Sequence, residues 1–128
     1  MATVSVQDGS VRIEFTTSEK LLSVHGSFTI PIENVAGASV EKPPGFWDAL
    51  KFFGTQSPWP FKMAGTFLYH SEVVFFDYQR EDTVLVIDLK PGASSYKHIF
   101  VHVDEPDTPA AAAGRILAAK AGTNVNAG

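Results

Sequence analysis

The sequence contains no cysteine, which excludes disulfides, thiolate nucleophiles and thiolate metal ligands. Basic residues are also few: ten Lys and Arg stand against fourteen Asp and Glu, and the formal charge of −4 provides no attractive field for a phosphate backbone. Nucleic acid is therefore not an expected partner. No apolar run is long enough to span a bilayer, and the first residues lack the basic start and apolar stretch of a signal peptide, so we expect a cytoplasmic protein.

The 128 residues are rich in short runs of Val, Ile, Phe and Thr between turn residues, which is the pattern of β-strands. Val11, Ile13 and Phe15 alternate with polar neighbours, and Asp8-Gly9 before them predicts a hairpin with residues 3–6. Further strands are predicted at residues 21–25, 27–32, 38–41, 66–69, 73–78, 83–89 and 97–103. Short polar connectors join the last four strands, which predicts an antiparallel meander.

One helix is predicted near the C-terminus, where Thr108 can cap a helix and Pro109 suits its first position. It should run over residues 109–121 and stop at Gly122, before a frayed tail at residues 123–128. Close approach to a strand is the expected reason for Gly114 within it. The predicted sheet-facing residues are Ala110, Ala113, Ile116, Leu117 and Ala121, with Arg115 and Lys120 near solvent.

Strands followed by a single helix exclude a parallel α/β sheet, because that fold needs helices between its strands. The runs at residues 73–78 and 83–89 are apolar on both faces, so one face should line a barrel interior. The other face needs a cover from the helix, from the aromatic segment described below or from a second subunit. We predict one mainly β domain over residues 1–122, an antiparallel barrel of seven to eight strands with a C-terminal α-helix.

Several short motifs follow one another along the chain: Thr17-Ser18-Glu19-Lys20-Leu21-Leu22, Phe28-Thr-Ile-Pro31 with Ile32-Glu-Asn-Val35, Gly54-Thr55 and Gly65-Thr66 across a proline-containing loop, and Val103-Asp-Glu-Pro106. In this order they resemble the uncharacterised bacterial pleckstrin-homology-like proteins, particularly those common in actinobacteria, over residues 11–117. The resemblance implies a bent, seven-stranded antiparallel barrel closed at one end by a C-terminal helix. It implies no settled activity and supplies no catalytic residues.

Residues 42–65 interrupt the strand pattern with four prolines, three glycines and both tryptophans. Long segments without regular structure are usually functional or disordered, and disorder is not typical of so aromatic a sequence. Near-helical spacing predicts a short amphipathic helix over residues 46–53. The candidate partner- or ligand-binding residues are Phe46, Trp47, Phe52, Phe53, Trp59 and Phe61. Two alternatives are that this segment plugs an open barrel end or inserts into a membrane surface.

Charged side chains give no clear site. A polyphosphate lipid head group needs clustered Lys and Arg, whereas the loop after the first strands offers Lys20 beside Glu19, so a membrane lipid is not an expected partner. We expect the three lysines of the aromatic segment to be ordinary solvated residues: Lys42, Lys51 and Lys62.

Catalytic and metal-binding patterns are also missing from the sequence. His98 and His102 share one face of a predicted strand but lie about 13 Å apart, too far to bind one ion together. No serine has the flanking glycines of a nucleophile elbow. The acidic residues before the helix are interpreted as a strand-to-helix connector: Asp104, Glu105 and Asp107. We therefore assign no catalytic residue, no metal and no cofactor.

Two function classes remain. The first is a non-enzymatic module that binds a protein partner or associates with itself through the aromatic segment or an apolar sheet face. The second is a small-molecule carrier or enzyme that uses the barrel mouth, lined by Trp47, Trp59, His98 and His102. Membrane-surface lipid binding is a further alternative. Fold alone cannot choose among them, because folds of this kind host unrelated functions.

Overall fold

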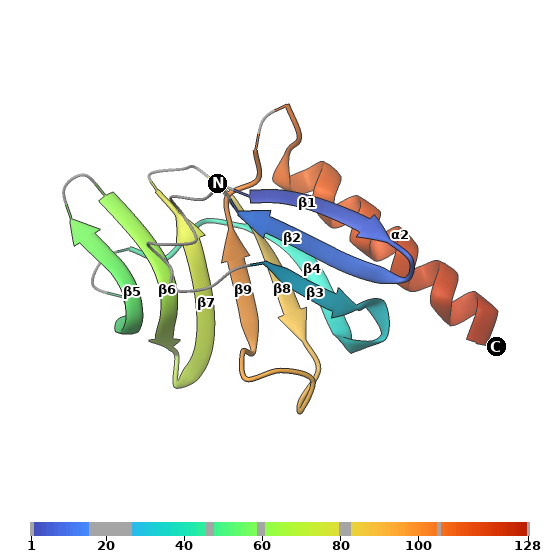
Figure 1. Cartoon of the computed structure of the whole chain (residues 1–128), viewed down its shortest axis with the longest axis horizontal. Coiled ribbons are helices and arrows are strands. Elements are labelled where there is room, and N and C mark those ends of the chain that lie inside the picture. The colour runs from blue at the N-terminus through green and yellow to red at the C-terminus, as the bar shows by residue number, and fades with distance from the viewer. Residues whose placement is uncertain are drawn as a thin grey trace.

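The computed structural model describes residues 2–15, 27–45, 48–58, 61–79, 83–104 and 106–127 of the chain (Figure 1). The strands form a three-stranded sheet of order β1-β2-β3 and a six-stranded sheet of order β4-β8-β9-β7-β6-β5, and an α-helix follows them. The mainly β class and the C-terminal helix are thus confirmed. The strand predicted at residues 21–25 lies outside the described residues.

The three-stranded sheet consists of β1 (Ala2–Gln7), β2 (Ser10–Phe15) and β3 (Phe28–Pro31), all antiparallel. Asp8 and Gly9 join β1 to β2 with positive φ angles of 53° and 75°, which a two-residue hairpin of this kind requires. This hairpin is therefore confirmed. Pro31 ends the edge strand β3, where the missing N–H removes no ladder bond.

The six-stranded sheet departs from the predicted meander. Its strands are β4 (Val35–Glu41), β5 (Leu50–Pro58), β6 (Phe61–Tyr69), β7 (Glu72–Tyr78), β8 (Val84–Leu89) and β9 (His98–Val101). β9 lies between β7 and β8 and runs parallel to β7, so the meander is wrong at this point. Strands β7, β8 and β9 are similarly apolar, and their patterns do not specify which of them is central.

The predicted closed barrel is also wrong for the described part of the chain, whose strands form two separate sheets. A 3-10 turn, η1 (Ile32–Asn34), carries the chain from β3 to β4 and so from one sheet to the other. A second link between the sheets lies at the start of β1, where the N–H of Ala2 donates to the carbonyl of His102, the residue after β9 (2.9 Å). Alternating strands bury one face equally well in two packed sheets or in a barrel, so the pattern could not distinguish these folds.

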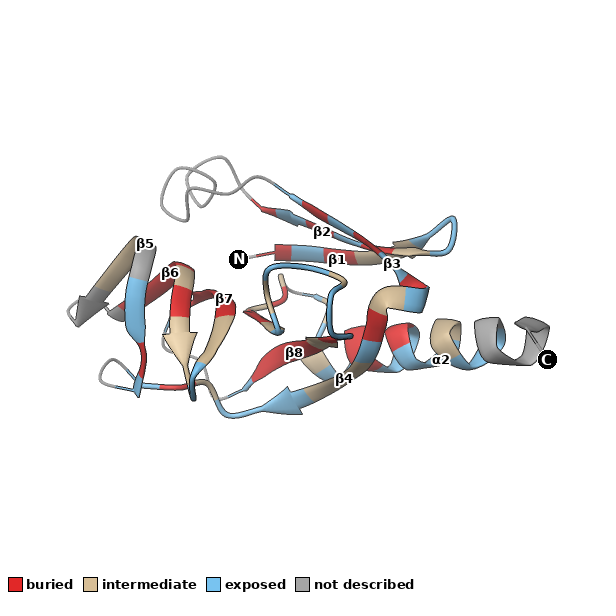
Figure 2. Ribbon diagram, turned by 90° about the horizontal axis from the view of Figure 1, so that it is seen from below, coloured by how far each residue is buried: buried red, intermediate tan, exposed pale blue. Residues whose placement is uncertain are grey.

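Each face of the six-stranded sheet carries a buried core, and Figure 2 shows buried residues on β6, β7 and β8. We call the face toward the three-stranded sheet the inner face and the opposite one the outer face. The inner-face core combines the apolar sides of β1, β2 and β3 with Phe75, Leu85, Ile87, Ile99 and Val101. The outer-face core contains Ala49, Met63, Phe67, Val74, Phe76, Tyr78, Val84, Val86 and Phe100. Because each face packs in a core, β7 and β8 are apolar on both faces, as predicted.

Residues 42–65 are not a single insertion between strands. They contain all of β5 and the first five residues of β6, which form an antiparallel hairpin at one edge of the sheet. The predicted amphipathic helix over residues 46–53 is wrong for residues 50–53, which lie in β5. Helical spacing misled here because β5 contains a bulge between Lys51 and Phe53, and a bulge breaks the period of two.

The helix α2 (Pro109–Ala127) contacts β1, β4, β8 and η1, elements of both sheets. Its N-terminal cap is as predicted: the hydroxyl of Thr108 accepts a hydrogen bond from the N–H of Ala111 (3.1 Å). The predicted stop at Gly122 is wrong, because α2 continues to Ala127: glycine disfavours helical angles without forbidding them. No helix in the described ranges is both long and apolar enough to cross a membrane.

The face of α2 that packs on the sheets differs from the prediction. Ala113 and Ile116 are buried as expected, together with Ala112. The predicted contacts of Ala110, Leu117 and Ala121 are wrong, since all three are exposed. The apolar residues are spread around the helix, and its C-terminal half extends beyond the strands in Figure 1. Alanine repeats therefore could not define the buried face.

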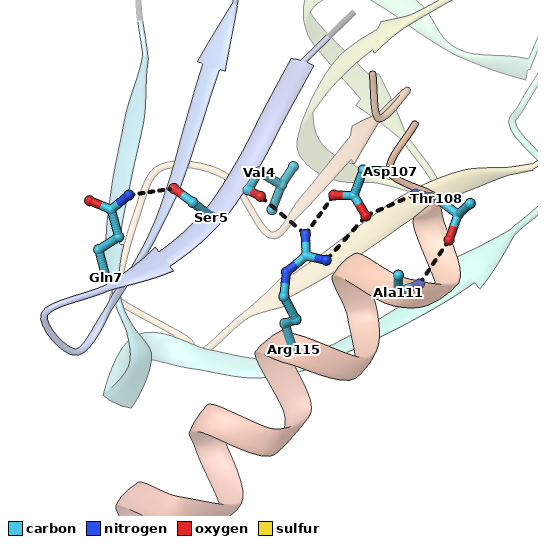
Figure 3. A network of polar contacts seen from close by, with 7 residues as sticks. All are labelled: Val4, Ser5, Gln7, Asp107, Thr108, Ala111 and Arg115. Carbon is cyan, nitrogen blue, oxygen red and sulfur yellow. Dashed lines mark hydrogen bonds and ion pairs between the residues drawn. The ribbon is translucent and has the colours of Figure 1, made fainter. Parts of the chain in front are cut away.

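A polar clamp fixes the start of α2 to β1 (Figure 3). The Arg115 guanidinium donates two hydrogen bonds to the Asp107 carboxylate, at 3.1 and 2.5 Å, and a third to the carbonyl of Val4 (3.1 Å). The N–H of Thr108 also donates to Asp107. The predicted role of Asp107 in the strand-to-helix connector is therefore confirmed, and Arg115 is a tether between helix and strand.

The clamp predicts an acid-dependent loss of stability. The hydrogen bond from Arg115 holds the pKa of Asp107 below its ordinary value, and the bond from Thr108 lowers it further. Since the folded-state pKa is lowered, the stabilisation is present above the ordinary aspartate pKa and is lost as the pH falls through the folded value. Both groups are partly exposed, so Asp107→Asn should cost about 0.5–1 kcal/mol at neutral pH. In urea denaturation this difference should disappear in acid; a pH-independent difference would contradict it.

Candidate functional site

The segment that crosses from β4 to β5, which we call the crossing segment, is described at residues 42–45 and 48–49. Its two ends lie at opposite edges of the sheet, because β4 and β5 are the edge strands among those described. Pro44 and Ala49 are buried, and the hydroxyl of Tyr78 donates to the carbonyl of Pro44 (2.7 Å). The described part of the crossing segment therefore has a structural role as a cover for the outer-face core.

Next to the start of this cover lies a cavity of about 210 Å³, which we call the outer-face pocket. It is lined by Glu41, Lys42, Tyr69, His70, Glu72, Val86, Asp88, His98 and Phe100. These residues come from five strands, β4, β6, β7, β8 and β9, from the residue that follows β4 and from the tight turn between β6 and β7.

His98 is the central polar group of the outer-face pocket. Its Nδ1 lies 2.6 Å from Oδ1 of Asp88, and its Nε2 lies 3.1 Å from Oε1 of Glu72. His98 and Asp88 are direct cross-strand partners on β9 and β8, which places their side chains on one face. Each ring nitrogen faces one carboxylate, so the imidazole is oriented by strands on both sides.

Tyr69 and His70 form the aromatic side of the pocket. Their rings stack with centroids 3.9 Å apart, and Tyr69 meets Phe100 edge-to-face at 5.9 Å. Burial raises the pKa of the Tyr69 hydroxyl above its ordinary value, and the carboxylates of Asp48 and Glu41 raise it further. The hydroxyl is thus a hydrogen-bonding group at neutral pH and a poor nucleophile.

The turn beside the pocket is conformationally costly. His70 and Ser71 connect β6 to β7 with φ angles of 50° and 63°, although neither is glycine. Positive φ in such residues costs of order 1 kcal/mol or more and often occurs at functional sites. The turn holds the stacked ring of His70 at the pocket.

The lining residues lack the arrangement of a metal site and the residue types of a serine or cysteine nucleophile. Asp88 and Glu72 contact opposite nitrogens of the same ring and so do not converge on one ion, and no three His, Asp or Glu side chains among the described residues are placed to hold a metal ion. The nine lining residues include no serine, threonine or cysteine. They offer carboxylates, an imidazole, one lysine and aromatic rings.

The sequence-predicted aromatic site stays a prediction. Phe46, Trp47 and Trp59 lie outside the described residues, as does Glu105 of the predicted acidic connector. Phe52 and Phe53 belong to β5 and Phe61 begins β6, but only their backbone is described. Of the four residues predicted to line a barrel mouth, His98 lines the outer-face pocket and His102 does not.

One of the three lysines differs from the prediction. Lys51 and Lys42 are exposed as expected, and Lys42 also lines the pocket. Lys62 is not solvated: its side chain is 8% exposed, and its Nζ lies 2.9 Å from Oδ1 of the fully buried Asp77. The cross-strand neighbourhood of β6 and β7 brings these two charges together, which spacing along the chain could not reveal.

Sequence reasoning missed Glu72 and Asp88 as site residues. A signal was present for Asp88, because it is the single charged residue in the otherwise apolar run of β8. A charged residue there has to reach a partner or solvent. Glu72 carried no comparable signal, since it follows a polar turn.

Comparisons of the chain with models of protein families, with curated proteins and with solved structures found no match.

Proposed function

We propose that the protein is a binding module and that its ligand site is the outer-face pocket. The observation that carries this proposal is the position of His98 between Asp88 and Glu72 at a cavity with an apolar and aromatic lining. Mixed pockets of this kind bind small ligands by burying an apolar part and orienting a polar part. This favours the small-molecule alternative over the aromatic-segment hypothesis.

Binding is proposed in preference to nucleophilic catalysis because the nine lining residues include no serine, threonine or cysteine that His98 could activate. The raised pKa of Tyr69 leaves it protonated, so it can donate a hydrogen bond to a ligand.

We also propose a pleckstrin-homology-like class for the fold. The support is the order of elements: short strands in two packed sheets, then a C-terminal helix that contacts both sheets. The parallel pairing of β7 with β9 departs from an all-antiparallel barrel. A binding role agrees with this class, although fold by itself does not assign a function.

The proposal is tested by amide NMR spectra recorded against a library of small fragments. Hits should shift the amide signals of Tyr69, Val86 and Phe100 and leave those of the distant Asp8-Gly9 hairpin unchanged. Native mass spectrometry of the purified protein should detect any retained small molecule directly. A library with no hit at the pocket would refute the proposal.

Protein association is a second candidate, favoured by the edge strand β5. Leu50 at its start is 67% exposed, and among the described strands β5 has a neighbour on one side only, which is the arrangement that strand pairing between proteins uses. Such a partner would be a protein or a second copy of this chain. The same native mass spectrum tests self-association, because it reports the number of copies: a monomer at all accessible concentrations excludes it.

A further inference from the structure

The outer-face pocket has an excess of negative charge. Glu41, Glu72 and Asp88 line it, against a single lysine, Lys42. Protonation of His98 would still leave three negative charges against two positive ones. The carboxylates of Glu41 and Asp48 also help to raise the pKa of Tyr69, which indicates a negative potential at its hydroxyl.

In one tautomer of the neutral His98 side chain, the contact with Glu72 has no hydrogen-bond donor. An imidazole that carries one proton donates from one nitrogen only. If that proton lies on Nδ1, at the shorter 2.6 Å contact with Asp88, then Nε2 and Oε1 of Glu72 are two acceptors 3.1 Å apart. A ligand with several N–H donors can bond to both of them and remove their repulsion.

The remaining lining suits an alkyl chain that carries a positive charge. Val86 and Phe100 are almost fully buried and provide apolar contact, while the Tyr69 and Phe100 rings can attract a cation. A cavity of about 210 Å³ is smaller than the pockets of roughly 300–1,000 Å³ that hold drug-sized ligands, so it suits a short chain and not a large cofactor.

We propose that the outer-face pocket selects a primary alkylammonium group, with its N–H donors on Glu72 and His98 and its chain against Val86 and Phe100. This inference rests on the proposed function and deepens it. The ammonium belongs either to a free small amine or to a lysine side chain of a partner protein, since the two share the same chemistry.

The test compares three probes of nearly equal size and different charge: n-butylammonium, butyrate and n-butanol. Titrations followed by amide NMR should give a Kd for n-butylammonium at least fivefold lower than for butyrate, with the largest shifts around His98 and Glu72. Equal or tighter binding of butyrate or n-butanol in the pocket would overturn the ammonium inference and leave the proposed function standing. Absence of pocket shifts with all three probes, and with the fragment library, would overturn both.

Variants that each remove one charge sharpen the test, because removing a negative charge should weaken n-butylammonium binding and removing a positive charge should strengthen it. Glu41→Gln removes a negative charge without touching His98 and should weaken n-butylammonium binding about threefold. Lys42→Gln removes the competing cation and should strengthen it by a similar factor. Glu33→Gln, an exposed acid outside the pocket, is the matched control and should change nothing. Equal effects of Glu41→Gln and Glu33→Gln would show that the pocket charges are not responsible.

A fourth probe separates the two sources of the ammonium group. Nα-acetyl-lysine methylamide presents the lysine side chain as a protein would. Tighter binding of this probe than of n-butylammonium supports a partner protein, because the backbone then adds contacts at the pocket mouth. Tighter binding of n-butylammonium supports a free amine.

Discussion

Replacing Gly54 by alanine is expected to destabilise the protein by about 3 kcal/mol or more. Gly54 has a φ of 114°, which side-chain-bearing residues rarely adopt. It pairs with Gly65 across β5 and β6, and an added Cβ would overlap the carbonyl oxygen of Ala64 and approach Cα of Gly65 to 2.8 Å. These are backbone atoms of a paired strand, so the clash cannot be relieved by a side-chain rotation. Urea denaturation measures the loss.

Gly114→Ala provides the control, because it adds the same methyl group in open space. A Cβ at Gly114 would meet nothing within 4 Å, so the expected close approach to a strand is wrong. Alanine in an exposed helical position should raise the free energy of unfolding by about 1 kcal/mol. If Gly54→Ala were as well tolerated as Gly114→Ala, the tight pairing of β5 with β6 would be wrong.

Lys62→Met is expected to cost about 3 kcal/mol, because it removes the cation beside the buried Asp77 and leaves that carboxylate in the protein interior. Methionine keeps most of the apolar stem, so the effect reports charge rather than volume. Lys51→Met is the control on the neighbouring strand: Lys51 is exposed, and its replacement should stay within about 0.5 kcal/mol. Thermal or urea unfolding of both variants measures the difference.

The double variant Lys62→Met with Asp77→Asn separates the ion pair from other effects. If Lys62 stabilises the fold by compensating Asp77, neutralising both groups should cost clearly less than the sum of the two single changes. Strict additivity would mean that the two charges do not depend on each other, contrary to their 2.9 Å separation.

The pocket and the ion pair each contain a carboxylate of β7, but the two carboxylates have different surroundings. Asp77 points to the inner side of β7 and is enclosed with Lys62, whereas Glu72 faces the pocket at the start of the same strand. One charge is buried with its partner, and the other stays partly exposed beside His98. A charge that keeps access to solvent is available to a ligand, which is why we place the function at the outer-face pocket.

Local signals in the sequence predicted those parts of the fold that depend on neighbouring residues. Asp8-Gly9 determined the first hairpin, because two consecutive residues with positive φ suit this turn. Thr108 and Pro109 determined where α2 begins. The alternation of Val11, Ile13 and Phe15 determined which side of β2 is buried.

Only the tertiary structure decided the strand order, the two separate sheets and the site. Several strands are apolar on both faces, so many pairings would bury them equally well, and the insertion of β9 beside β7 follows from packing of the whole chain. The contacts of His98 with Asp88 and Glu72 span 10 and 26 residues of sequence. Pairing across strands brings distant residues together, and a pattern read along one strand carries no record of its neighbours.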